Sequence, residues 1–300
     1  MGPVAPARVL VSGANAVGVD AREADALLEV AVEAALTAGA LLAERARHGA
    51  ERQVSAKSTP TDLVSEADLA SEQMIRELLA SKRPDDGFVG EEGAPTQGTS
   101  GLSWVVDPLD GTINFLYGIP QWCVSVAVRD REQTIAGAVY DPNRDELFSA
   151  TRHSRPTLVS KRGTIELGGS SATGPAAVHG GEPSSSRGED LASAMVATGL
   201  AYDASVRAAQ ARVLTRVAPR VRDIRRFGSA ALDLTWTAMG RYDAYFERTV
   251  KQWDIAAGAL ICERAGLHVL ELPVHENLPW GILAARPALA GPLLELVGGE

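Results

Sequence analysis

The stretch W-V-V-D-P-L-D-G-T-I-N-F, residues 104–115, places two carboxylates and a hydroxyl in a turn between an apolar strand and a helix. Pro108 sets φ for the turn, and Gly111 permits close backbone approach just before the helix. Asp107 and Asp110 repel each other there unless a cation lies between them, and Mg²⁺ favours carboxylates together with phosphate oxygens. The stretch therefore predicts a divalent-metal site. For the motif taken alone, the alternative is an Asp-Pro turn with helix-capping aspartates.

Two further segments favour the metal site. The segment G-E-E-G, residues 90–93, comes shortly before this strand, so adjacent strands could place its carboxylates beside Asp107. The segment W-D-I-A-A-G-A-L-I-C-E-R-A-G, residues 253–266, places Asp254 at the start of a helix of small residues, where an N-cap is the alternative role. Together the three segments indicate one shared acidic site.

These segments resemble the inositol monophosphatase family of Mg²⁺-dependent, lithium-sensitive phosphatases, over roughly residues 24–298. Members of the wider family also act on fructose bisphosphate and phosphoadenosine phosphate. The resemblance implies a layered α-β-α-β-α sandwich of the inositol monophosphatase and fructose-1,6-bisphosphatase type. It also implies a homodimer.

Apolar periodicity agrees with that fold, because it predicts an α/β protein with an α+β first half and an α/β second half. Helices are expected over 23–48, from 65, over 205–218, 228–239 and from 255. Strands are expected over 87–89, 103–106, 123–128, 135–140 and 146–150, as an antiparallel meander, and over 194–197, 223–226, 243–246 and 267–272. The predicted divisions are a loose extension over 1–22, a first half over 23–155, a loop-rich connection over 156–190 and a second half over 191–300.

Composition limits the partners. A net charge of −9 argues against nucleic acid and anionic membranes, and it suits a phosphorylated substrate only if bound cations reverse the charge of an acidic pocket. Cys123 and Cys262 lack the spacing of a disulfide framework or zinc site, so both are expected to be reduced core thiols. No run of about 18 apolar residues is apparent, which indicates a cytoplasmic protein.

Carried over position by position, the resemblance assigns the metal ligands. Glu91, Asp107 and the carbonyl of Leu109 match the ligands of the first ion, and Asp107, Asp110 and Asp254 match those of the second. A third, weaker ion also uses Glu91. Oxygen donors without His or Cys favour Mg²⁺ or Mn²⁺ over zinc.

The resemblance also assigns catalytic roles. The backbone N–H groups of Gly111 and Thr112 are expected to hold the phosphate at a helix N-terminus. The nucleophile is a metal-activated water, which Thr112 and Glu91 orient and deprotonate, with Asp68 behind Thr112. A capping box explains Asp68 as well. Lys57 matches a family lysine near a loop that closes over the metals, with an ordinary surface lysine as the alternative.

Substrate contacts form a separate set of matches. The residues that match them are Asp110, Gly228, Ser229, Ala230, Glu247 and Asp254. Glu247 discriminates between substrates, because a vicinal diol rewards a carboxylate acceptor more than a nucleotide or an imidazole alcohol does. A solvated strand end is its alternative role. The chain departs from the family pattern at Leu267, where a glycine is usual, and over 152–163, which lacks the usual Gly-rich hairpin.

The expected function is that of a Mg²⁺-dependent phosphomonoesterase acting on myo-inositol 1-phosphate or a related cyclitol or sugar phosphate. Histidinol phosphate, fructose 1,6-bisphosphate and 3′-phosphoadenosine 5′-phosphate are alternative substrates. A non-catalytic interaction protein on the same fold is the alternative of another class. Clustered carboxylates argue against that class, because without metal they reduce stability.

Overall fold

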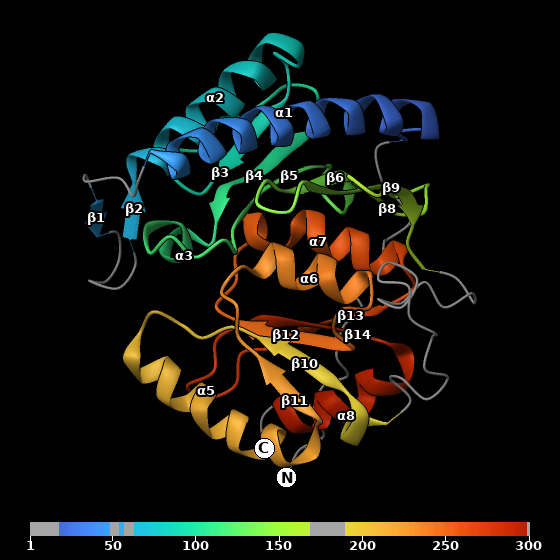
Figure 1. Ribbon diagram of the computed structural model, residues 1–300. Coiled ribbons are helices and arrows are strands. Elements are labelled where there is room, and N and C mark those ends of the chain that lie inside the picture. The colour runs from blue at the N-terminus through green and yellow to red at the C-terminus, as the bar shows by residue number, and fades with distance from the viewer. Residues whose placement is uncertain (1–17, 49–53, 57–62, 169–189, 299–300) are drawn as a thin grey trace.

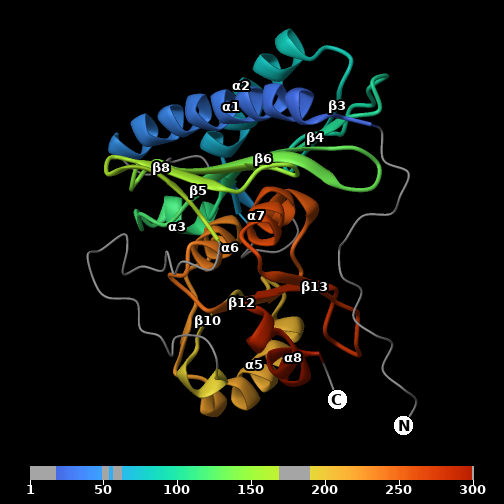
Figure 2. The ribbon, with the colours of Figure 1, turned by 90° about the vertical axis from the view of Figure 1, so that its right-hand side faces the viewer.

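The computed structural model describes residues 18–48, 54–56, 63–168 and 190–298. Its elements stack in α-β-α-β-α order, with two sheets separated by a central pair of helices (Figures 1 and 2). The helices of the three layers are α1 (Ala21–Arg47) and α2 (Glu66–Lys82), α6 (Ala230–Ala238) and α7 (Gln252–Arg264), and α5 (Ala204–Val217) and α8 (Pro287–Val297). The predicted sandwich is confirmed.

The first sheet has seven strands in the order β3-β4-β5-β6-β7-β8-β9. Their bounds are Gly87–Gly90, Ser103–Asp110, Cys123–Arg129, Thr134–Asp141, Glu146–Thr151, Thr157–Ser160 and Gly163–Glu166. From β4 onward the strands form the predicted antiparallel meander. Strand β3 differs, because it pairs with β4 in parallel after the chain returns through residues 91–102. A short pair, β1 (Val54–Ala56) and β2 (Leu63–Ser65), stands apart from this sheet.

The connection predicted as a loop from residue 156 begins as a β-hairpin instead. Strands β8 and β9 extend the first sheet and are joined by Lys161 and Arg162, and Gly163 at the start of β9 has a φ of +108°. Both strands are short and largely polar, so their sequence carries little apolar alternation. The rest of the expected loop, over 169–189, lies outside the described residues.

The second sheet has five strands in the order β11-β10-β12-β14-β13. Their bounds are Asp223–Arg225, Met195–Thr198, Ala244–Arg248, Gly281–Ala285 and His268–Leu272. Strand β10 pairs in parallel with β11 and β12, whereas β14 is antiparallel to both of its neighbours. Neither β14 nor α8 was predicted. The two 3-10 turns are η1 (Leu191–Ser193) and η2 (Ala218–Arg220).

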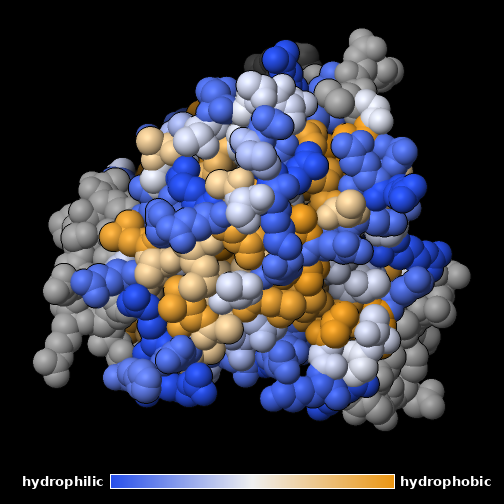
Figure 3. All heavy atoms as spheres, turned by 90° about the horizontal axis from the view of Figure 1, so that it is seen from above, coloured by the Kyte–Doolittle hydropathy of each residue, from blue (hydrophilic) through white to orange (hydrophobic). Residues whose placement is uncertain are grey.

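Helix α1 begins two residues before its predicted start, because the Asp20 side chain caps it by accepting a hydrogen bond from the Glu23 N–H at 2.8 Å. By length and composition α1 is apolar enough to cross a membrane, which corrects the expectation that no such segment exists. The core helix of a globular domain can have the same length and composition, and the buried face of α1 packs on the first sheet with α2 beside it. Figure 3 shows the opposite face, where apolar and polar side chains are mixed. Of the loose extension predicted over 1–22, residues 1–17 lie outside the described residues, and Ala21 and Arg22 belong to α1.

Candidate active site

The turn after β4 has a backbone that only glycine accommodates. Gly111 has a φ of +96° and precedes the short helix α3 (Thr112–Leu116). A Cβ at this position would lie 2.8 Å from the Gln121 carbonyl oxygen. The Asn114 amide holds the turn in place by donating to the Gln121 and Phe227 carbonyls, each at 2.7 Å. The turn is therefore fixed to both halves of the chain.

A pocket of about 390 Å³ opens where this turn meets α6, α7 and β12. Of the predicted site residues, those that line it are Glu91, Asp107, Leu109, Asp110, Gly111, Thr112, Gly228, Ala230, Glu247 and Asp254. Asp68 and Ser229 are buried behind its wall. Lys57 lies outside the described residues. Residues that are far apart in the sequence, from Glu91 to Asp254, therefore line one cavity.

Three aspartates of the pocket accept hydrogen bonds from backbone N–H groups. Asp107 accepts from Leu109 at 3.1 Å, and Asp254 accepts from Lys251 at 2.7 Å. Because α7 starts at Gln252, Asp254 is its third residue and not its N-cap, so the N-cap alternative is wrong.

Asp110 links the first sheet to the middle helix layer. Its Oδ2 accepts from the Ser229 hydroxyl at 2.6 Å and from the Ala231 N–H at 2.8 Å. A carboxylate at this position satisfies donors at the start of α6 and interacts favourably with its dipole. The Ser229 side chain is therefore occupied with Asp110, and the pocket wall on either side of it is formed by Gly228 and Ala230.

The carboxylates raise one another's pKa. Burial raises the pKa of Asp107 and of Asp254 well above the ordinary range, and the nearby charges of Glu91 and Asp110 raise both further. Burial also raises the pKa of Asp110 to about 6, against the opposing effect of its bond from Ser229. A cation in the pocket would relieve this repulsion.

The donor set fits a hard divalent cation. Every predicted ligand offers a carboxylate or carbonyl oxygen, which suits Mg²⁺ or Mn²⁺. Within the part of the chain that the structure describes, no three Asp, Glu, His or Cys side chains are already gathered closely enough to hold an ion.

Thr112 and Asp68 form the predicted pair. The Thr112 hydroxyl donates to Asp68 Oδ1 at 2.8 Å, with the Leu109 carbonyl at 3.1 Å as a second acceptor. The other oxygen of Asp68 accepts from the Ser65 N–H at 2.9 Å and its hydroxyl at 2.6 Å. Asp68 therefore closes the capping box of α2 and also holds Thr112, so the two explanations of this residue are compatible.

Glu72 positions the Gly-Glu-Glu-Gly segment, and sequence reasoning missed it. Its Oε2 accepts from the Glu92 N–H at 2.8 Å, and its Oε1 pairs with Arg76 at 2.9 Å. A Cβ at Gly90 or Gly93 would collide with the Glu72 carboxylate, which explains both glycines around Glu91. The sequence signal is the spacing, because Glu72 lies four residues after Asp68 and therefore on the same face of α2. A glutamate in a helix is more often exposed, so this spacing alone does not predict that Glu72 is buried.

Glu247 lines the pocket from strand β12. Tyr245 donates to its Oε2 at 2.9 Å, and burial raises the pKa of Glu247 to about 7 against the opposing charge of Arg226. Arg226 was missed as a pocket residue, although it lies two positions before Gly228. The other lining residues that were not predicted are Leu200, Ala201, Tyr202, Asp203, Thr249, Val250, Lys251 and Trp253.

Fold and pocket together define a layered α/β protein with an acidic, oxygen-rich pocket at the junction of its layers. The chain belongs to the inositol monophosphatase family, whose family model matches residues 23–293.

Sequence relatives and solved structures agree with this assignment. The inositol-1-monophosphatase SuhB of Mycobacterium tuberculosis is 41% identical over 247 residues, which cover 80% of this chain and 80% of the relative. The Nus factor SuhB of Pasteurella multocida is 36% identical over 275 residues, covering 90% and 95%. The crystal structure of the extragenic suppressor protein SuhB from Bartonella henselae superposes with a TM-score of 0.76 at 32% identity, covering 90% and 98%.

Proposed function

We propose that the protein is a Mg²⁺-dependent phosphomonoesterase that hydrolyses myo-inositol 1-phosphate or a related cyclitol or sugar phosphate. The observation that carries this proposal is the single pocket that contains Glu91, Asp107, Asp110 and Asp254 beside the Gly111 turn. Four carboxylates that line one pocket are costly in a protein without cations, and family membership supplies a reaction that uses them.

Glu91, Asp107, Asp110, Asp254 and the Leu109 carbonyl would hold two or three Mg²⁺ ions, with Mn²⁺ as a substitute. When bound, the ions supply Lewis acidity for the phosphate oxygens and lower the pKa of water. Inhibition by lithium is expected on the same family grounds.

The protein's own groups would orient the reacting species. The N–H groups of Gly111 and Thr112, at the N-terminus of α3, would donate hydrogen bonds to the phosphate. The Thr112 hydroxyl donates a hydrogen bond to Asp68, so a lone pair of its oxygen remains to accept a hydrogen bond from the attacking water. Glu91 would take the proton of that water.

Glu247 favours a polyol leaving group. Its carboxylate is fixed by Tyr245, and Arg226 lines the same pocket. A carboxylate acceptor together with a guanidinium donor suits a ring whose adjacent hydroxyls both donate and accept. Gly228 and Ala230 leave room for that ring.

The experiment is a phosphate-release assay on myo-inositol 1-phosphate, fructose 1,6-bisphosphate, histidinol phosphate and 3′-phosphoadenosine 5′-phosphate, all with Mg²⁺. The proposal expects the highest kcat/KM for the cyclitol. A preference for histidinol phosphate or the nucleotide by tenfold or more, about 1.4 kcal/mol, would reject the substrate assignment.

We further propose a cytoplasmic homodimer that binds neither nucleic acid nor membranes. The net charge of −9 supports the absence of those two partners, and the packing of α1 on the sheet supports a helix that stays in the fold.

A non-catalytic interaction protein is the second candidate. The relative from Pasteurella multocida carries the name Nus factor, which favours an interaction role for that protein. Tyr117, Ile119 and Phe227 are large apolar side chains exposed on this chain. Absence of phosphate release from every substrate, with Mg²⁺ present, would favour this candidate.

A further inference from the structure

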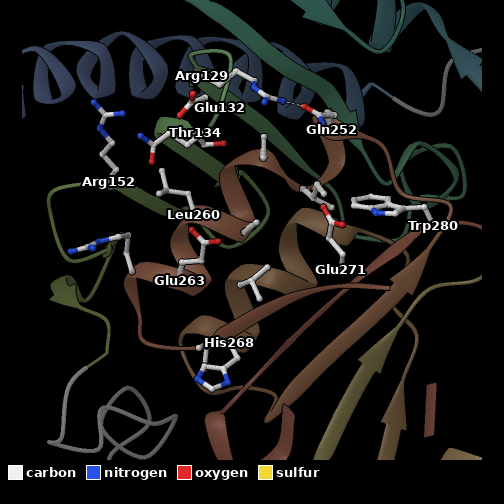
Figure 4. A pocket seen from close by; sticks show the side chains of 17 residues that line it. Arg129, Glu132, Thr134, Arg152, Gln252, Leu260, Glu263, His268, Glu271 and Trp280 are labelled. Atoms are coloured by element: carbon white, nitrogen blue, oxygen red, sulfur yellow. Dashed lines mark hydrogen bonds between the residues drawn. The ribbon is translucent and has the colours of Figure 1, made fainter. Parts of the chain in front are cut away.

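A second cavity, of about 610 Å³, lies on the other face of α7 from the catalytic pocket. Asp254 faces the catalytic pocket, whereas Ile255, Ala259 and Glu263 line the second cavity, and helical geometry places those two sets on opposite faces. The β5–β6 turn and strand β13 close its sides (Figure 4). Its volume is within the range of small-molecule sites.

The floor of this cavity is apolar. Ile255, Ala259 and Leu260 form it from α7, and Leu267 and Val269 continue it toward β13. Leu267, the departure from the family's usual glycine, therefore adds to the apolar lining.

The arginines at the rim are largely engaged with the protein. Arg129 donates to Gln252 and to the carbonyls of Asp130 and Arg131. Arg152 donates to the Val19 carbonyl at 2.8 Å. Arg264 donates its Nε to the Ser154 carbonyl at 2.8 Å. Arg129 and Arg152 therefore have an acceptor at each guanidinium nitrogen, whereas Arg264 bonds through Nε.

The carboxylates of Glu263 and Glu271, in contrast, have neither a hydrogen bond nor an ion pair among the described residues. Figure 4 shows both carboxylates in the cavity, with Glu271 beside Trp280. Burial raises the pKa of Glu263 to about 7, against the opposing charge of Arg264. Glu263 and Glu271 therefore offer carboxylate oxygens to a positively charged hydrogen-bond donor that enters the cavity.

We propose that the cavity is a second ligand site that binds an organic amine with an apolar body. The ammonium groups would pair with Glu263 and Glu271, the carbon chain would cover the floor around Leu260, and the ring of Trp280 would stabilise an ammonium held at Glu271. This site does not depend on phosphate hydrolysis, because none of these residues lines the catalytic pocket.

The test is calorimetric titration of the full-length protein with 1,8-diaminooctane, in excess Mg²⁺ so that the catalytic carboxylates are engaged. Neutral 1,8-octanediol and anionic suberate serve as ligands of similar length and different charge. The proposal expects one diamine per chain and no measurable binding of the other two.

Variants then locate the site. Glu263→Gln and Glu271→Gln should each weaken diamine binding by about tenfold, the effect of one charge-assisted hydrogen bond. Glu247→Gln, the same change in the catalytic pocket, should leave diamine binding unaltered, and thermal unfolding checks that all three variants are folded. The proposal is overturned if the diamine does not bind at millimolar concentration, if both cavity variants bind it like the wild type, or if Glu247→Gln weakens binding equally.

Discussion

At the scale of single residues, the Thr112–Asp68 bond is the contact whose removal is easiest to interpret. Thr112→Val keeps the shape of the side chain but removes the hydroxyl that donates to Asp68 at 2.8 Å. If this hydroxyl orients the attacking water, kcat should fall by about 100-fold or more, with a smaller change in KM. Steady-state kinetics on inositol 1-phosphate would measure this. Thr112→Ser, which restores the hydroxyl, should recover most of the rate, and equal losses in both variants would contradict the assigned role.

Glu247→Gln tests the substrate class at the same scale. The amide keeps the size of the side chain but loses the charged acceptor that Tyr245 fixes. A diol substrate should lose on the order of 1–3 kcal/mol in kcat/KM, whereas an aryl phosphate without hydroxyls should lose little. Comparable losses on the two substrates would mean that Glu247 supports the metal site or the fold.

At the scale of elements, the β4–α3 turn should tolerate no Cβ. Gly111→Ala combines a φ of +96° with a collision against the Gln121 carbonyl. Gly101→Ala is the matched control, because Gly101 has a φ of +85° and open space around it. Denaturant unfolding should show a loss of about 1 kcal/mol for the control and more for Gly111→Ala. Equal losses would mean that the turn relaxes around the added methyl group.

The sequence predicted elements with a strong apolar period and missed those without one. Helix α1 and strands β4 to β7 have long apolar patterns, and the structure differs from their predicted bounds by only a few residues. Helix α8 contains Pro292 and begins at Pro287, so its sequence reads as a broken segment although its buried face is apolar. Strand β14 is fully buried, which removes the alternation that marks a strand.

At the scale of the whole molecule, the buried carboxyls should make the metal-free protein less stable as pH rises. The folded-state pKa values of Asp110, at about 6, and of Glu247, at about 7, lie above their unfolded values. The folded state therefore holds protons that the unfolded state releases, and stability is lost between about pH 4 and pH 7.

Thermal unfolding in chelator measures this effect, with Glu247→Gln as the comparison. The Tm of the variant minus the Tm of the wild type should increase from pH 4.5 to pH 7.5, because only the wild type retains the carboxyl. A constant or decreasing difference would contradict the raised pKa of Glu247.

Contacts between residues far apart in the sequence are the part of the site that the sequence predicted least well. Motif matches predicted part of the pocket wall, together with Asp68 and Ser229 behind it, but not Glu72, Arg226 or the remaining lining residues. The Asn114–Phe227 bond and the Asp110–Ser229 bond each join positions more than 100 residues apart. Glu72 and Arg226 act in the same way, since their role depends on which elements the fold brings together.

The measurement that tests the central claim most directly is phosphate release from myo-inositol 1-phosphate by the wild type and by Asp107→Asn. Both proteins are assayed in chelator and after addition of Mg²⁺, and thermal unfolding in chelator shows that the variant is folded. Removing one of the mutually repelling buried carboxylates should leave the metal-free variant at least as stable as the wild type. The account predicts no turnover by the wild type in chelator, full recovery with Mg²⁺, and no recovery by the variant. Undiminished activity in chelator would contradict it, as would a variant that retains more than about a tenth of the wild-type kcat, a loss below about 1.4 kcal/mol.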